Sequence, residues 1–127
     1  MPHHPPQPNK AFDRSYRFRG RTIFSEVYGQ RVRREAGPLL VYARPNELDF
    51  SRLGLSVGRR VGNAVRRNRV KRLLRETFRL NRHAWPTGYD WLIVVRPHDP
   101  VDMSRYARHL AEATSKLDEK WQKKTKN

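Results

Sequence analysis

The sequence contains no cysteine, which excludes disulfide bonds, thiolate zinc sites and cysteine nucleophiles. No stretch approaches the ~18 consecutive apolar residues of a membrane-spanning helix, and the N-terminus lacks the apolar core of a signal peptide. Acidic residues are scarce, since 12 Asp and Glu stand against 28 Lys and Arg, a formal net charge of +16. So large a charge destabilises a compact chain by self-repulsion. We therefore expect a polyanionic partner, no membrane partner and a cytoplasmic location.

Length and aromatic content bound the domain organisation. With 127 residues the chain can bury one core but not two. Its three Trp, five Tyr and five Phe can anchor that core, and a wholly disordered chain would lack them. Four prolines among the first eight residues disfavour helix there. We predict a disordered Pro-rich tail over 1–13, a single RNA-binding domain over 14–121 and a basic C-terminal tail over 122–127.

Hydrophobic spacing between the tails predicts a mixed α/β order. We expect, in chain order, a helix over 22–28, strands over 30–35, 38–44 and 53–58, a helix over 63–81, a strand over 91–96 and a helix over 104–121. This αβββαβα order predicts a two-layer α/β (α+β) sandwich. Parallel pairing of 53–58 with 91–96 across the long helix would form a βαβ unit. The residues do not reveal the handedness of that crossover, for which right-handed is the general rule.

The helix over 63–81 is rich in arginine and has two unlike faces. On a helical wheel one arc holds apolar positions and a threonine, namely Val70, Leu73, Leu74, Thr77 and Phe78. The opposite arc holds polar and basic positions, namely Asn68, Lys71, Arg72, Arg75 and Arg79, with Arg69 at its flank. Arg66 and Arg67 project on the apolar side, so we expect the first turn to protrude beyond the sheet.

The basic face has two possible interpretations. A run of charge is usually the solvated face of an amphipathic helix. Here the charges have almost all one sign, so Lys71 and Arg75, and Arg75 and Arg79, repel one another at helical spacing. The arginines of the first two turns, Arg66, Arg67 and Arg69, also oppose the helix dipole. Selection for helix stability alone would avoid both features, so the face is predicted to bind phosphates.

The same segment carries a family resemblance. Residues 61–76 read VGNAVRRNRVKRLLRE, which resembles the RNR signature of the protein subunit of bacterial ribonuclease P. The surroundings match over roughly 17–120, with an upstream aromatic pair (Phe24 and Tyr28), LLVYA and RLGLSV strands, and an apolar strand after the signature. Two positions depart from the family pattern. Residues 58–60 read GRR where the family usually has Ser-Lys-Lys, and Arg66 stands where it often has an apolar or small residue.

The resemblance implies both a fold and a role. The fold would be an αβββαβα sandwich, also seen in ribosomal-protein domains, with an unusual left-handed crossover through the arginine helix. The role would be the protein component of a ribonucleoprotein endonuclease that removes 5′ leaders from precursor tRNA. The resemblance places the catalytic groups and magnesium on the RNA, with no cofactor and no small-molecule substrate bound by the protein alone. The positions expected to contact the catalytic RNA are Arg59, Arg60, Asn63, Arg66, Arg67, Asn68, Arg69, Lys71, Arg72 and Arg75.

A second RNA site is predicted between the short helix and the sheet. Alternation along 53–58 leaves Gly54, Ser56 and Gly58 opposite the apolar positions, and glycines on one face suggest a close approach to the backbone. Phe24 and Tyr28 form one stripe of the short helix. From spacing alone these aromatics could equally be core residues that cover the sheet. The resemblance favours a groove for the single-stranded leader, where rings stack on bases, lined by Phe24, Tyr28, Tyr42, Ser56 and Gly58.

A free-standing nuclease is the competing enzymatic hypothesis. Two-metal nucleases need converging carboxylates, but the closest acidic pairs lie in proline-flanked loops typical of turns, namely Glu47 with Asp49 and Asp99 with Asp102. Acid–base cleavage would need two histidines to converge, and nothing in the spacing of His83, His98 and His109 indicates it. No Walker-type phosphate loop is present. We expect neither catalytic nor metal-binding residues on this chain.

Two kinds of RNA-binding module also share features with this chain. A ribosomal protein would have the same size, basicity and tails, and the RNA that co-purifies would distinguish it. A K-homology domain needs a G-x-x-G loop, and Gly58 and Gly62 are one residue too far apart for that.

Overall fold

Helices and strands follow one another in the predicted αβββαβα order. The computed structural model describes residues 16–125, so the predicted tail over 1–13 lies outside the described residues. The elements are α1 (Arg21–Gly29), β1 (Arg33–Ala36), β2 (Leu39–Pro45), β3 (Arg52–Val57), α2 (Ala64–Asn81), β4 (Tyr89–Val95) and α3 (Met103–Thr125). Two short 3-10 turns, η2 (Arg59–Val61) and η3 (Arg82–Ala84), flank α2.

Two element boundaries differ from the sequence prediction by three residues or more. The first strand begins at Arg33 rather than at residue 30, because Gln30 and Arg31 donate backbone hydrogen bonds to Val27 and Tyr28 and so complete the end of α1. Helix α3 continues to Thr125, whereas the sequence predicts a tail from residue 122. The indole N–H of Trp121 donates to the Ala43 carbonyl at 2.9 Å, which holds this last part of the helix against the sheet.

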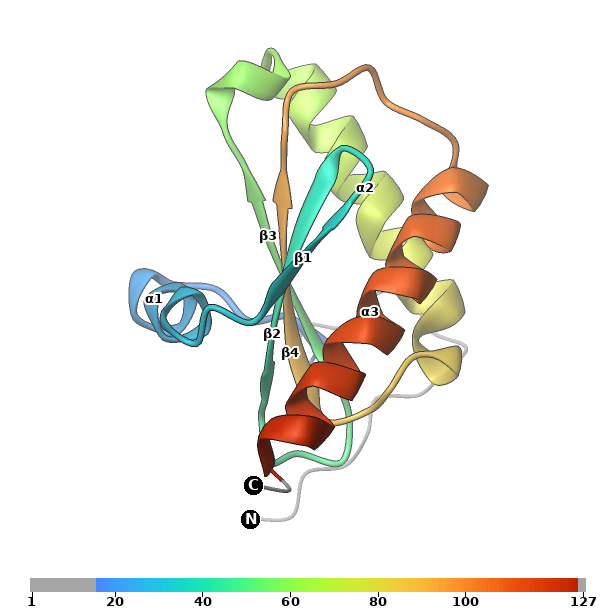
Figure 1. The fold of residues 1–127 in the computed structure, drawn as a ribbon. Helices are drawn as coiled ribbons and strands as arrows, with labels where there is room; N and C mark the ends of the chain where they lie inside the picture. Colours follow the sequence, from blue (N-terminus) through green and yellow to red (C-terminus); the bar gives the residue numbers. More distant parts are fainter. Residues whose placement is uncertain (1–15, 126–127) are drawn as a thin grey trace.

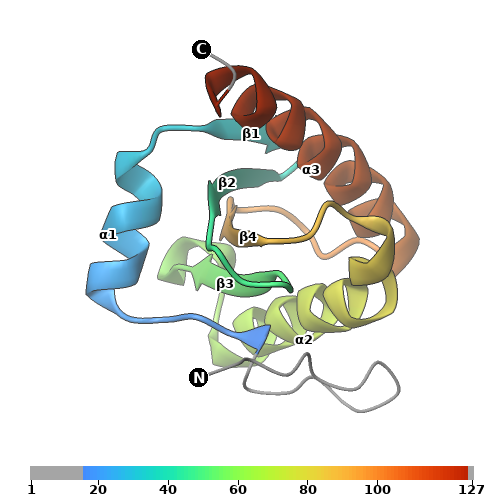
Figure 2. The same ribbon diagram turned by 90° about the horizontal axis from the view of Figure 1, so that it is seen from below.

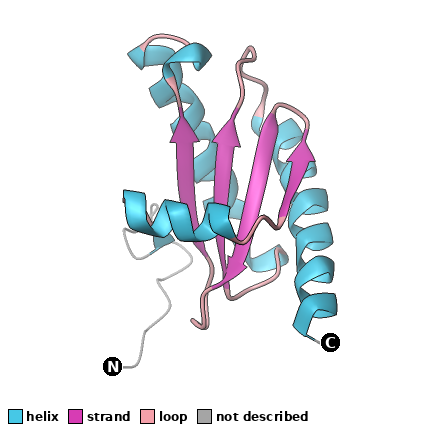
Figure 3. Cartoon of the chain, turned by 60° about the vertical axis from the view of Figure 1, so that its left-hand side comes forward, coloured by secondary structure: helices cyan, strands magenta, loops and turns pink. Residues whose placement is uncertain are grey.

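The sheet has the strand order β1-β2-β4-β3. Strand β2 is antiparallel to both β1 and β4, whereas β3 is parallel to β4. The connection from β3 to β4 runs through α2, so the predicted βαβ unit is confirmed. Figure 3 has α1 in front of the sheet and the two long helices behind it, with β4 to the right of β3 and both strands pointing upward. The crossover is therefore left-handed, against the general rule and as the resemblance implies.

The two faces of the sheet are covered unequally. Helices α2 and α3 lie side by side on one face, and α1 alone crosses the other (Figures 1 and 2). The main core lies under α2 and α3 and includes the fully buried side chains of Leu74, Phe78, Trp91, Ile93, Tyr106, Leu110 and Leu117. A smaller cluster of Phe18, Val27, Tyr42 and Leu92 lies under α1. Part of the face under α1 therefore remains accessible to a ligand.

Strand β3 alternates as predicted, but its glycine has an internal partner. Leu53, Leu55 and Val57 pack toward the main core. Gly54 faces the other way, and a Cβ atom there would lie 2.7 Å from the ring of Phe18. The close approach that the glycine suggests is therefore made by the chain itself. The Phe18 amide donates to the Leu53 carbonyl at 3.1 Å, so the segment before α1 runs along this edge of β3.

Replacing Gly54 tests this packing. We expect Gly54→Ala to lower the free energy of unfolding by about 1–3 kcal/mol, because the buried Phe18 ring must move. Gly29→Ala is the matched control, since no atom lies within 4 Å of a Cβ at Gly29, and its change should stay below about 1 kcal/mol. Urea denaturation measures both. Equal stability of the two variants would contradict the assigned contact.

Candidate nucleic-acid interface

The arginine helix α2 is oriented by its apolar stripe. Val70, Leu74, Thr77 and Phe78 are buried, as the helical wheel predicts. The opposite face therefore points outward, and Asn68, Arg69 and Arg72 are exposed. The side chain of Asn63 accepts a hydrogen bond from the Arg66 amide at 2.9 Å, which caps the helix. Arg59 and Arg60 lie exposed in η2, on the approach to this cap.

The positive charge of α2 has few internal partners. Glu76 is the only acidic residue of the helix. Its carboxylate accepts hydrogen bonds from Arg79, and these hold the pKa of Glu76 below its ordinary value. Within residues 16–125, no carboxylate lies within ion-pair distance of Arg67, Arg69, Lys71, Arg72 or Arg75. Five neighbouring cations on one helix thus remain available to an anionic ligand.

Arg66 differs from its neighbours because its guanidinium has partners within the protein. Its guanidinium donates to the carbonyl of His98 at 3.2 Å and pairs with the carboxylate of Asp99. Its stem lies against Gly62, where φ is +149° and a Cβ atom would be 2.5 Å from the Arg66 Cδ. The first turn of α2, which is predicted to protrude beyond the sheet, is therefore linked through Arg66 to the loop after β4.

Lys71 and Arg75 lie at a hollow beside the outer edge of β3. This β3-edge hollow has a volume of about 160 Å³ and is lined by Arg17, Phe18, Arg19, Phe24, Leu53, Leu55, Lys71 and Arg75. Burial and the charges of Arg17 and Arg19 lower the pKa of Arg75. The Nε–H of Arg75 is buried and has no hydrogen-bond acceptor in the described part of the chain. Four cations converge here beside two aromatic rings, which is an environment that favours a bound anion.

A second hollow lies at the other end of α1. This tyrosine hollow has a volume of about 370 Å³ and is lined by Tyr28, Arg31, Arg33 and Tyr42. The rings of Tyr28 and Tyr42 meet edge to face, with centroids 4.7 Å apart. Arg33 donates to the Tyr42 hydroxyl at 3.1 Å, and its guanidinium carbon lies 5.9 Å from the centre of that ring. Aromatic rings and arginines are again adjacent.

The predicted groove residues are divided between these places. Phe24 lines the β3-edge hollow, whereas Tyr28 and Tyr42 line the tyrosine hollow. Between the two hollows, Val27 of α1 is buried against the sheet. Ser56 is half-buried on the same face of the sheet as Gly54, and Gly58 is exposed beyond the end of β3 with open space around it. Ser56 and Gly58 line neither hollow.

The structure also brings together residues that the sequence assigns to separate sites. Phe24 is predicted in the leader groove, and Lys71 and Arg75 on the arginine helix, yet all three line the β3-edge hollow. The residues that the sequence reasoning misses are Arg17, Phe18, Arg19, Arg31 and Arg33. A signal is present for the first three, because residues 17–21 read RFRGR, a basic run with an aromatic inside it.

Metal ligands, paired histidines and a membrane-spanning helix are the other features to look for among the described residues. Within 16–125 no three His, Asp or Glu side chains are grouped so as to hold a metal ion. His98 is held between the Arg96 carbonyl and the Tyr106 hydroxyl, each at 2.7 Å, while His109 packs against Gly37. In the same part of the chain no helix has the length and apolar character needed to cross a membrane.

Comparisons with known proteins point to one family. The family model described as Ribonuclease P matches residues 12–118. The ribonuclease P protein component of Natranaerobius thermophilus is 36% identical over 104 residues, covering 81% of this chain and 85% of that protein. The solved structure of the Thermotoga maritima RNase P protein is 33% identical, with a TM-score of 0.65, and the match covers 74% of this chain and 90% of that one. A mutant Staphylococcus aureus RNase P protein gives a TM-score of 0.72 at 25% identity, covering 83% and 90%.

The contributions of Arg66 and Arg72 to RNA binding can be compared through the salt dependence of binding to a single-stranded RNA homopolymer. Each phosphate that a protein neutralises adds about 0.7 to the slope of log affinity against log salt. We expect Arg72→Ala to reduce the slope by about this amount, because Arg72 is exposed and has no carboxylate partner in the described chain. Arg66→Ala should change the slope less, because the Arg66 guanidinium already donates to the His98 carbonyl and to Asp99. Equal losses of slope would show that Arg66 leaves Asp99 to bind RNA.

Proposed function

The chain belongs to the ribonuclease P protein family, and from this premise we propose that it binds both the catalytic RNA of ribonuclease P and the 5′ leader of precursor tRNA. The observation that carries the proposal is the β3-edge hollow, where cations of the arginine helix meet an aromatic side chain of α1. Proteins that bind single-stranded RNA combine aromatic rings, which stack on bases, with cations, which contact phosphates.

The outer face of α2 is proposed to hold the catalytic RNA through its phosphates. Exposed or half-buried cations without carboxylate partners in the described chain support this assignment, namely Arg69 and Arg72 on the outer face of α2, Arg67 in its first turn, and Arg59 and Arg60 in η2. Arginine is suited to the task because its planar guanidinium grips phosphate oxygens with two parallel hydrogen bonds. Asn63 and Asn68 add amide groups to the same surface.

The leader is proposed to follow α1 from one hollow to the other. Phe24 would stack on one base next to Lys71 and Arg75, and the Tyr28–Tyr42 pair would contact another next to Arg33. Ser56 and Gly58 would extend this path along the open end of β3, where small side chains let a sugar–phosphate backbone approach. Stacking and phosphate contacts read little sequence, which suits leaders that differ between precursor tRNAs.

The hydrolytic step is proposed to belong to the RNA and its magnesium ions. The β3-edge hollow presents four cations, which repel a divalent metal ion and attract the RNA that would carry it. The protein would then act by binding and orienting the substrate, which lowers the barrier without a catalytic side chain.

The assignment of hydrolysis to the RNA can be tested with the purified chain and precursor tRNA. We expect no 5′ cleavage by the protein alone, and restored cleavage when catalytic RNA and magnesium are added. Mature tRNA serves as the control for non-specific degradation. Specific removal of the leader by an RNA-free preparation would place catalytic groups on the protein and contradict the assignment.

Phe24→Ala tests the leader groove in the assembled enzyme. Loss of one stacked base should weaken precursor tRNA binding by roughly 1–3 kcal/mol, with little change for mature tRNA or for protein–RNA assembly. The matched control is Ile23→Ala, since Ile23 is also a half-buried apolar residue of α1 and packs on the cluster under that helix, but lines neither hollow. Equal losses for precursor and mature tRNA, or equal effects of the two variants, would make Phe24 an ordinary packing residue.

A further inference from the structure

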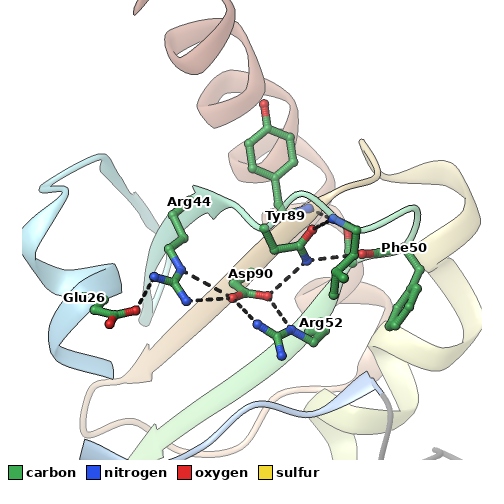
Figure 4. A network of polar contacts seen from close by, with 9 residues as sticks. Glu26, Arg44, Phe50, Arg52, Tyr89 and Asp90 are labelled. Carbon is green, nitrogen blue, oxygen red and sulfur yellow. Dashed lines mark hydrogen bonds and ion pairs between the residues drawn. The ribbon is translucent and has the colours of Figure 1, made fainter. Parts of the chain in front are cut away.

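A buried carboxylate joins three strands on the face of the sheet that α1 crosses. Asp90 of β4 is fully buried and lies directly between Arg44 of β2 and Arg52 of β3 in the strand registers. Arg52 grips it with Nε at 2.8 Å from Oδ1 and a terminal nitrogen at 2.7 Å from Oδ2 (Figure 4). Arg44 donates two longer bonds of 3.4 Å to Oδ2. Asn46 donates to Oδ1 at 3.1 Å.

One of the two arginines continues from this carboxylate to α1. The remaining terminal nitrogen of Arg44 donates to Oε2 of Glu26 at 2.6 Å. Figure 4 shows the sequence of contacts from Asp90 through Arg44 to Glu26. The Arg44 side chain is only 20% exposed, so its charge is partly shielded from water. Besides the apolar cluster that Leu92 and Val27 share, an electrostatic contact therefore links β4 to α1 through a single guanidinium.

The other arginine reaches α1 through aromatic rings. The guanidinium carbon of Arg52 lies 5.7 Å from the centre of the Phe18 ring. Phe18 in turn meets the Phe24 ring edge to face, with centroids 5.7 Å apart. Arg52 therefore supports the side chain of Phe24 from behind, through one intermediate ring.

Helix α1 depends on such external contacts. It has nine residues and no side-chain hydrogen bond at its N-terminal cap, and Val27 is its only buried residue. A helix of this length is marginal in isolation, because the cost of nucleation is spread over few hydrogen bonds. The contacts that Glu26 and Phe24 make with the sheet therefore help to decide where α1 lies.

We propose that Asp90 is a positioning residue for leader binding, which acts by holding Arg44 and Arg52 so that they seat α1 and the ring of Phe24 over the sheet. We call this set of residues, Glu26, Arg44, Arg52 and Asp90, the Asp90 clamp. The inference rests on the proposed function, because it assigns α1 to the leader groove. The clamp contains two carboxylates and two guanidinium groups, so its arginines are neutralised and are not additional phosphate ligands.

Two substitutions test the clamp at its two ends. Asp90→Asn keeps the shape but removes the charge that both arginines share. Glu26→Gln releases only α1, and it should fold because the Glu26 side chain is 53% exposed and Arg44 keeps its contact with Asp90. In the assembled enzyme we expect each to raise KM for precursor tRNA, by about tenfold for Asp90→Asn, with kcat and protein–RNA assembly unchanged. Global loss of folded protein would instead lower assembly and activity together.

Hydrogen exchange in the free protein gives a readout that needs no RNA. We expect Glu26→Gln to speed amide exchange in α1 by about fivefold and to leave α2 and α3 unchanged. The matched control is Glu112→Gln, which removes another arginine–carboxylate pair, Arg34 with Glu112 at 3.4 Å, between β1 and α3. This control should alter neither exchange in α1 nor KM for precursor tRNA.

The outcomes separate the clamp from the leader groove. Unchanged α1 exchange in a folded Glu26→Gln variant, or equal acceleration in all three helices, would overturn the clamp whatever the RNA assays give. Altered α1 exchange with unchanged KM would also overturn it, provided that Phe24→Ala raises KM. If Phe24→Ala leaves KM unchanged, the leader groove itself is wrong, and the positioning role assigned to Asp90 falls with it.

Discussion

The burial of one apolar stripe determines where most of the positive charge of this protein points. Val70, Leu74 and Phe78 must lie against the sheet, since each is fully buried and each contributes about 1.5–3 kcal/mol by leaving water. That requirement fixes the rotation of α2 about its axis. The remaining positions of the helix then present their cations to solvent or to the edge of β3. Repulsion among these cations opposes folding, so the stripe also provides the energy that keeps them together.

The unequal covering of the sheet follows from the same arrangement. The crossover from β3 to β4 and the long C-terminal helix both lie on one face, and together they bury the main core. The other face receives only the nine residues of α1. A short helix cannot cover four strands, so hollows remain at its two ends, each with aromatic side chains and arginines in its lining. The candidate RNA path thus lies where one short helix leaves part of the sheet uncovered.

Local patterns are sufficient to predict the elements and the facing of their side chains. The spacing in α2 identifies its buried stripe, and alternation in β3 separates Leu53 and Leu55 from Gly54. Long-range contacts are beyond such patterns. The ring of Phe18 over Gly54, the pairing of Arg66 with Asp99, and the presence of Phe24 and Arg75 at one hollow each bring together residues at least 33 positions apart. The left-handed crossover is also not visible in the residues, since handedness is a property of the assembled layers.

The few carboxylates of the chain decide which arginines remain available to an anionic ligand. Asp90 and Glu26 engage Arg44 and Arg52, and Asp99 engages Arg66. Asp102 caps the start of α3, and Asp118 accepts a hydrogen bond from Tyr89, so these charges also serve the scaffold. Within residues 16–125 none of these carboxylates lies within ion-pair distance of Arg69 or Arg72 on the outer side of α2. Because a carboxylate takes up donors and charge of the arginine it pairs with, this distribution separates cations that build the fold from cations that can bind a ligand.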